Sequence, residues 1–200
     1  MAFPEAIDGL GKLLKNHDLD TFQRFSSKFD DLDDLMTKIN KIDDINRYDS
    51  IIDNLDDAIR SGDEGNIRGF KNQLEETYNI RGEYPNNKIT AEDINTHLDV
   101  KVENAIDGDN LWIDTKSAKD MEVNKLKDLL TEPNPGFKEI DGITELRITG
   151  ESSSLSKTDI DNIVNDYYTV QPGEKMDQLV IRTPNPDCPE GGFRYYKTDY

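Results

Sequence analysis

The amino-acid sequence predicts an α/β protein, and three observations lead to that class. Apolar residues in the first third of the chain recur at helical spacing. Residues 98–117 alternate between apolar and polar as two strands of a hairpin do. Beyond the hairpin, helix-like and strand-like segments take turns, which is typical of a mixed sheet flanked by helices. We therefore expect an acidic helical segment at 1–61 and an α/β domain at 62–200.

The N-terminal segment is predicted to be a helical hairpin or small bundle. Its apolar positions are mostly three or four residues apart: Leu32, Leu35, Ile39, Ile42, Ile45, Ile51, Ile52, Leu55 and Ile59. Aspartate pairs fill the spaces at 30–31, 33–34, 43–44 and 56–57. No D-x-D-x-D-G loop with a glutamate at its twelfth position is present, so these acids indicate solvated helix faces rather than Ca²⁺ sites.

A second helix is predicted over 66–80, after the break SGDEG, and the turn-rich RGEYPNNK follows it. Past the hairpin we expect a helix at 119–132, a strand at 143–150, a helix at 156–170 with Ser156 as its N-cap, and a strand at 177–184. The turn-rich tail is expected to close with an edge strand.

The hairpin carries the most informative pattern. Asp99 and Lys101 alternate with apolar residues in its first strand, and Asp114 and Lys116 do so in its second. Asp107-Gly108 is a favoured two-residue turn. That turn pairs Asp99 with Lys116 and Lys101 with Asp114, whereas a four-residue loop shifts the pairs by one step. In both cases all four polar side chains share one face.

The composition limits the classes of function. The formal charge is −18 and the pI is about 4.4. These values argue against a protein that binds nucleic acid only by neutralising its phosphates with basic residues. A high-salt source, a local basic groove or a divalent metal would each reconcile this acidity with a nucleic-acid substrate. A single cysteine, Cys188, and two histidines exclude disulfide frameworks and cysteine- or histidine-rich metal centres.

The chain is also expected to be soluble. It holds no run of 18 apolar residues and no N-terminal signal pattern. It can nevertheless be a piece of a larger exported protein.

The four polar residues contain the components of phosphodiester hydrolysis. That reaction needs a hard divalent cation to neutralise phosphate and lower the pKa of a water, and Mg²⁺ takes one or two carboxylates together with water and phosphate. A nearby lysine can orient the attacking water or stabilise charge on phosphorus. Asp99 and Asp114 are the candidate metal ligands, and Lys116 is the candidate catalytic lysine. Mg²⁺ or Mn²⁺ is the expected metal, and Zn²⁺ is a third option.

This arrangement resembles the PD-(D/E)xK nuclease superfamily, the restriction-endonuclease-like fold. The match is Asp99 followed fifteen residues later by Asp114-Thr115-Lys116. That family's core is a helix, a three-stranded meander, a helix and a further strand. The segment GNIRGFKNQLEETYN resembles the G-x-x-x-E-L-E pattern of its nuclease toxin domains. Gly69 matches the glycine and Glu75 the second glutamate, whereas Gln73 replaces the first.

The resemblance, which covers roughly 62–150, implies a role for the helix and a biological setting. Glu75, or Glu76 beside it, would join Asp99 and Asp114 at the metal and in catalysis. Nuclease toxin modules of polymorphic or contact-dependent inhibition systems sit at the C-terminus of large secreted proteins. They act on DNA or tRNA in the cytoplasm and are neutralised by an immunity protein. The expected function is therefore that of a toxin nuclease with a cognate immunity partner.

Other residues have two interpretations each. Lys101, Lys119 and Arg147 are candidate phosphate-binding residues, and each is alternatively a surface charge. Trp112 is either packing or a base-stacking platform. His97 shares the predicted face with Asp99 and is either a structural hydrogen-bonding residue, the favoured interpretation, or a catalytic one.

The main alternative function belongs to another class. An acidic binding protein, either an immunity protein or a nucleic-acid mimic, would dock onto a basic nuclease by charge complementarity. The net charge of −18 and the even spread of acids favour it. A halophilic structural module rests on composition alone.

Overall fold

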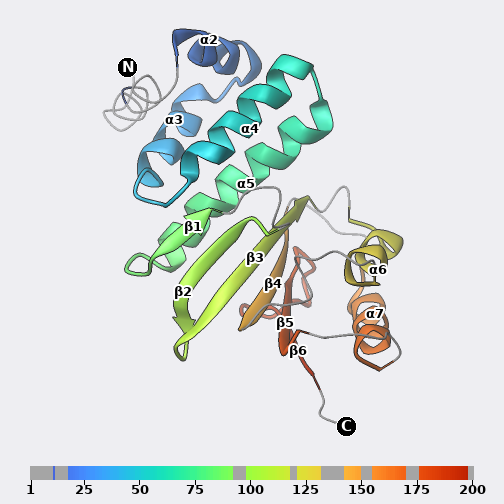
Figure 1. Ribbon diagram of the computed structural model, residues 1–200. Helices are drawn as coiled ribbons and strands as arrows, with labels where there is room; N and C mark the ends of the chain where they lie inside the picture. Colours follow the sequence, from blue (N-terminus) through green and yellow to red (C-terminus); the bar gives the residue numbers. More distant parts are fainter. Residues whose placement is uncertain are drawn as a thin grey trace. The chain divides into compact units, whose positions relative to one another are not determined.

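The computed structural model describes Gly11 and residues 18–91, 98–117, 121–131, 142–149, 155–169 and 176–197 (Figure 1). The chain forms two compact units, Met1–Ala91 and Glu92–Tyr200. The sequence placed the boundary after residue 61 instead. The difference arises because the helix that follows residue 61 packs on the helices before it.

The first unit contains four described helices and a short strand. They are α2 (Leu19–Lys28), α3 (Leu32–Lys41), α4 (Tyr48–Ser61), α5 (Glu64–Glu83) and β1 (Ile89–Ala91). The helical periodicity is thereby confirmed for the described residues. The fully buried positions are largely the predicted apolar ones, among them Ile39, Ile52, Leu55 and Leu74. α4 ends at Gly62, which has φ +72°, and the Asp63 carboxylate caps α5 by accepting from the backbone N–H groups of Gly65 and Asn66.

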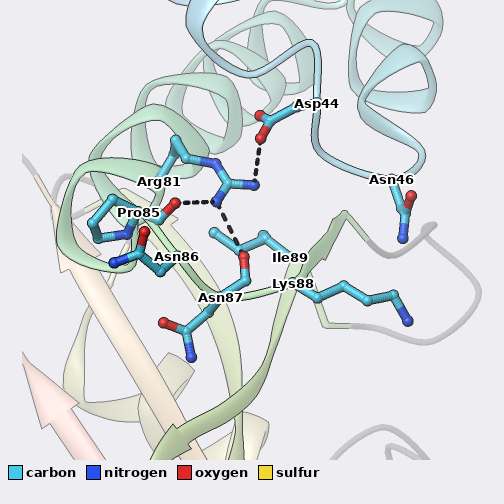
Figure 2. Close-up of a pocket in the computed structure, with 8 residues that line it drawn as sticks. All are labelled: Asp44, Asn46, Arg81, Pro85, Asn86, Asn87, Lys88 and Ile89. Atoms are coloured by element: carbon cyan, nitrogen blue, oxygen red, sulfur yellow. Dashed lines mark hydrogen bonds and ion pairs between the residues drawn. The ribbon is translucent and has the colours of Figure 1, made fainter.

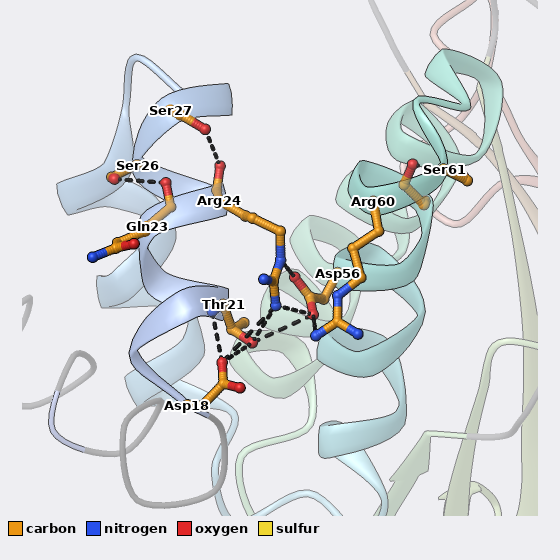
Figure 3. A network of polar contacts seen from close by, with 10 residues as sticks. Asp18, Thr21, Gln23, Arg24, Ser26, Ser27, Asp56, Arg60 and Ser61 are labelled. Atoms are coloured by element: carbon orange, nitrogen blue, oxygen red, sulfur yellow. Dashed lines mark hydrogen bonds and ion pairs between the residues drawn. The ribbon is translucent and has the colours of Figure 1, made fainter.

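A buried carboxylate joins α2 to α4 (Figure 3). Asp56, on α4, accepts from Arg24 Nε at 2.6 Å through Oδ1 and from Arg24 Nη2 at 2.7 Å through Oδ2, and Arg60 Nη2 lies 2.9 Å from the same Oδ2. Thr21 Oγ1 donates to it at 3.3 Å. Only 8% of the Asp56 side chain is exposed, so this paired arrangement satisfies a charge that burial alone would penalise.

A small pocket of about 420 Å³ also lies in the first unit (Figure 2). Arg81 Nη1 donates to the backbone carbonyls of Tyr84 and Asn87, and Arg81 Nη2 pairs with Asp44 at 3.1 Å. Arg81 thereby fixes the turn that follows α5.

The second unit is an α/β unit built on a mixed sheet. Its strands are β2 (Val100–Ile106), β3 (Asp109–Ser117), β4 (Ile143–Thr149), β5 (Gln178–Arg182) and β6 (Phe193–Tyr196), and they lie side by side in that order. β3, β4 and β5 are parallel, whereas β2 and β6 run antiparallel to their neighbours. Helices α6 (Val123–Thr131) and α7 (Lys157–Thr169) connect the parallel strands, as parallel pairing requires.

One face of this sheet is covered by α6 and α7. Leu126 and Val164 of these helices belong to one buried cluster with Leu146, Ile148 and Leu179 of the strands. Ser156 caps α7 as predicted, because its Oγ accepts from the Asp159 N–H at 3.1 Å. Within the described part of the chain, no helix is both long and apolar enough to cross a membrane.

The opposite face of β4 holds a buried ion cluster. Glu145 alternates with Leu146 along the strand, and its carboxylate pairs with Arg147 on the same strand and with Arg182 Nε of β5 at 3.1 Å. Glu145 and Arg147 are 2% and 3% exposed. The cluster is thus part of the structure of the sheet.

The hairpin turns where the sequence predicts, but its register changes within β2. Asp107 and Gly108 have φ of +53° and +95°, and Ile106 pairs with Asp109 across them. Further along, Val102 pairs with Leu111, so β2 has two more residues than β3 between these pairs.

Asn104 lies in this bulge with φ +52°, and its N–H donates to the Asn110 side chain at 3.2 Å. As a result Lys101 pairs with Trp112 and not, as the sequence suggested, with Asp114.

Candidate functional site

Asp99 lies at a bend immediately before β2. Its backbone N–H donates to the Ile113 carbonyl at 2.9 Å, and its Oδ2 accepts from both the N–H and the Oγ1 of Thr115 at 2.6 Å. The side chain of Asp99 thus replaces a backbone acceptor where the ladder between β2 and β3 ends. Leu98 packs with the cluster beneath α6 and α7, so regular alternation along β2 begins only at Val100.

Asp114 and Lys116 form an ion pair on β3. Lys116 Nζ lies 2.5 Å from Asp114 Oδ1, as strand geometry predicts for residues two apart on one face. Asp114 is 1% exposed, whereas 36% of the Lys116 side chain is exposed. The second oxygen, Asp114 Oδ2, is buried and has no hydrogen-bond donor among the described residues. A buried acceptor in this state needs a proton or a cation.

The electrostatics link these two residues to Asp99. Burial raises the pKa of Asp114 to about 7, the charge of Lys116 opposes that rise, and the neighbouring carboxylate of Asp99 adds to it. Burial acts to lower the pKa of Lys116, but the negative charges of Asp114 and Asp99 outweigh it and the net shift is upward.

The sequence therefore identified which three groups meet but not how they meet. Asp99 was expected across from Lys116, and it lies instead beside Asp114 and Thr115. Both the bulge at Asn104 and the bend at Asp99 depart from the regular ladder from which the pairing was inferred.

Two neighbouring carboxylates suit some metals better than others. Across the described ranges, no group of three or more histidine, cysteine, aspartate or glutamate side chains could hold a metal ion. Mg²⁺ and Mn²⁺ are commonly held by one or two carboxylates with water and phosphate, whereas Zn²⁺ usually has three or four protein ligands. The carboxyl pair, with its unsatisfied Asp114 Oδ2, fits Mg²⁺ or Mn²⁺ better than Zn²⁺.

Glu75 and Glu76 have partners within the helical unit. Glu75 on α5 lies 3.4 Å from Lys38 of α3 and 3.8 Å from Lys71. Glu76 accepts from the Asn79 side chain at 3.0 Å. The helix predicted around them is confirmed, but the structure describes these glutamates within the first unit and Asp99 and Asp114 within the second.

The three predicted phosphate-binding residues differ in their surroundings. Lys101 lies on the face of Asp114, with its Nζ 4.8 Å from the centroid of the Trp112 ring and 4.0 Å from Glu103. Arg147 is buried in the ion pair with Glu145 on the other face, so its assignment as a surface phosphate-binding residue is corrected. Lys119 lies outside the described residues, as does His97.

Thr115 is the site residue that sequence reasoning missed. It occupies the variable position of the D-x-K triplet, and both of its donors hold Asp99. No sequence pattern signals this role, because it depends on the bend at Asp99.

No family model matches the chain, and no curated protein or solved structure matches it.

Proposed function

We propose that the sheet unit is a metal-dependent nuclease of the PD-(D/E)xK type, with Asp99, Asp114 and Lys116 as its site. The single observation that carries the proposal is the buried Asp114 Oδ2, which has no donor in the described part of the chain while Asp99 lies beside it and Lys116 holds the other oxygen. The succession of α6 and the parallel strand β4 after β2 and β3 supports the proposal, whereas the hairpin has two strands where the resemblance implies a meander of three.

Each residue has a separate task in this proposal. Asp99 and Asp114 would hold a Mg²⁺ or Mn²⁺ ion, which when bound neutralises phosphate and makes a water more acidic. Thr115 fixes Asp99 by two hydrogen bonds. Lys116, the more exposed partner of Asp114, is positioned to orient the attacking water or to stabilise the charge on the phosphate. DNA and tRNA are the proposed substrates, and a toxin module neutralised by an immunity protein is the proposed setting.

The test uses the purified full chain with plasmid DNA and with total tRNA, in Mg²⁺, in Mn²⁺ and in a chelator. Cleavage is expected only with a divalent cation. Asp99→Asn, Asp114→Asn and Lys116→Gln should each reduce the rate by at least about a hundredfold, as the loss of one transition-state contact does.

Matched controls exist on the same elements. Asp109 is an exposed residue of β3 and Lys125 an exposed residue of α6, and Asp109→Asn and Lys125→Gln should retain the rate. Circular dichroism establishes that each variant is folded. The proposal fails if neither nucleic acid is cut under any metal condition, or if the site variants and the controls cleave equally well.

A second function has one observation in its favour. The first unit presents many exposed acids, namely Asp30, Asp31, Asp33, Asp34, Asp43, Asp44, Asp53, Asp57, Asp63 and Glu64. Such a surface suits an acidic inhibitor that binds a basic nuclease. In that case affinity for a basic protein would fall steeply with salt, and Lys116→Gln would leave the affinity unchanged.

A further inference from the structure

Lys101 and Trp112 form an ordered cation–aromatic pair next to the candidate site. They are paired directly across β2 and β3, and Lys101 Nζ lies 4.8 Å from the centroid of the Trp112 ring. Glu103 lies 4.0 Å from the same ammonium group. Only 23% of the Lys101 side chain is exposed, so this lysine is held in place more firmly than a freely mobile surface lysine.

The pair lies one strand step from the carboxylates. Trp112, Asp114 and Lys116 alternate along β3 and therefore share one face. Two strand residues span about 6.8 Å, which is comparable to the separation of neighbouring phosphates in an extended nucleic-acid strand. This is the face on which α6 and α7 pack over β4 and β5, and the partly buried Trp112 contacts their cluster. On this face the Lys101–Trp112 pair, the carboxyl pair and Lys116 follow one another in order.

We propose that Lys101 binds the phosphate next to the scissile one, so that the substrate is a polynucleotide strand lying along β3. Trp112 is a positioning residue that holds the Lys101 ammonium through its ring. This inference rests on the proposed nuclease function and names its substrate class, a chain with at least two consecutive phosphates.

The charge balance of the protein explains why this contact matters. A chain of net charge −18 repels polynucleotides over most of its surface. Each phosphate that is neutralised by a fixed lysine releases counterions and contributes to affinity. A preorganised ammonium beside the site would attract the polynucleotide locally, against the repulsion that the net negative charge of the chain produces.

The experiment compares two substrates in Mg²⁺: a single-stranded oligonucleotide of about 20 nucleotides and bis(p-nitrophenyl) phosphate, which has only one phosphate. The variants are Lys101→Gln, Lys101→Arg and the α6 control Lys125→Gln. We expect Lys101→Gln to raise the KM for the oligonucleotide about tenfold more than that for bis(p-nitrophenyl) phosphate. It should also reduce the magnitude of the slope of log(kcat/KM) against log[salt] by about one, as expected for the loss of one phosphate contact. Lys101→Arg should restore both quantities.

Trp112 is tested with its own pair of variants. Its indole N–H is buried and has no hydrogen-bond partner, so Trp112→Phe keeps a ring under Lys101 without losing a bond. Trp112→Leu removes the ring. We expect Trp112→Leu to raise the oligonucleotide KM several-fold with little change in kcat, and Trp112→Phe to restore it.

The outcomes separate this inference from the function on which it rests. If bis(p-nitrophenyl) phosphate is hydrolysed but Lys101→Gln changes both substrates by the same factor, the inference is overturned and the nuclease function stands. If neither substrate is hydrolysed by the unsubstituted chain, both are overturned. An unchanged salt slope in Lys101→Gln also contradicts a phosphate contact.

Discussion

Lys116 Nζ lies 2.5 Å from one oxygen of Asp114, while the other oxygen of that carboxylate is buried with no donor among the residues that the structure describes. Lys116 thus pairs with only one of the two oxygens of a carboxylate that is 1% exposed. The rest of the stabilisation must come from a proton on the Asp114 carboxyl or from a bound cation. Burial is the main reason that the pKa of Asp114 is raised to about 7. The change from the protonated to the ionised carboxyl therefore falls in the pH range of ordinary buffers.

The first prediction concerns stability against pH. Because the pKa of Asp114 is higher in the folded chain than in the unfolded chain, the folded state binds more protons between about pH 4 and pH 7. The free energy of unfolding therefore loses a contribution on the order of 3–4 kcal/mol as the pH rises through that window in the absence of metal. Below about pH 4 the carboxyl is protonated in both states and this contribution is fully present.

Urea denaturation at a series of pH values, in a chelator, measures this effect. Asp114→Asn cannot titrate, so its free energy of unfolding should lack this decrease. Asp109→Asn, an exposed acid on the same strand, should follow the unsubstituted chain. Parallel pH profiles for Asp114→Asn and the unsubstituted chain would contradict the raised pKa.

The second prediction concerns divalent metal. A cation at Asp99 and Asp114 binds the ionised carboxylates in competition with protons, so its affinity should increase with pH. We expect 10 mM Mg²⁺ to raise the Tm clearly more at pH 7.5 than at pH 5, since a ligand that binds only the folded state stabilises it by mass action. Scanning calorimetry with and without EDTA measures the shift, and Asp99→Asn and Asp114→Asn should each abolish it. An equal shift in these variants would locate the metal elsewhere.

Much of the fold could be predicted from periodicity, because burial on one side of an element determines where its apolar residues must fall. The helices around Leu35, Leu55 and Leu74 and the turn at Gly108 follow from local rules. The register did not follow, since the bulge at Asn104 depends on how two strands fit together.

The candidate site likewise has contacts that local spacing predicts and contacts that it does not. The D-x-K spacing on one strand was sufficient to place Asp114 against Lys116. In contrast, Glu75 was assigned by motif similarity, and helix packing gives it Lys38 as a partner. Tertiary packing, which decides such partners, is not encoded in local spacing.

The third prediction concerns the helical unit. Asp56→Ala should lower the free energy of unfolding by about 2–3 kcal/mol, because it removes the charge-assisted bonds from Arg24 that join α2 to α4. The neighbouring Asp57 is exposed, so Asp57→Ala should change stability by less than about 0.5 kcal/mol. Chemical denaturation monitored by circular dichroism compares the two, and similar losses would rule out a specific role for Asp56.

The fourth prediction concerns the buried cluster on β4. Glu145→Gln keeps the shape of the side chain but leaves Arg147 buried without its carboxylate. Breaking a buried ion pair from one side typically costs about 3–5 kcal/mol, so the variant should be strongly destabilised. Glu122→Gln, at an exposed position, is the control. A Glu145→Gln variant that unfolds at the same urea concentration as the control would show that the pair contributes nothing.

The last prediction compares two glycines with opposite surroundings. Gly142, just before β4, has φ +115°, and a Cβ at that position would lie 2.5 Å from the Asn110 carbonyl oxygen. Because Asn110 lies in β3, next to the start of β4, relief of this clash would disturb the pairing of the two strands. Gly142→Ala is therefore expected to destabilise the protein by at least about 2 kcal/mol, from backbone strain and steric overlap together. Gly69, in the middle of α5, has no atom within 4 Å of such a Cβ. Gly69→Ala should stabilise by about 0.5–1 kcal/mol, since alanine is the better helix former. Thermal unfolding of both variants measures the difference, and a Gly142→Ala variant as stable as Gly69→Ala would contradict the close approach of β3 and β4 at this point.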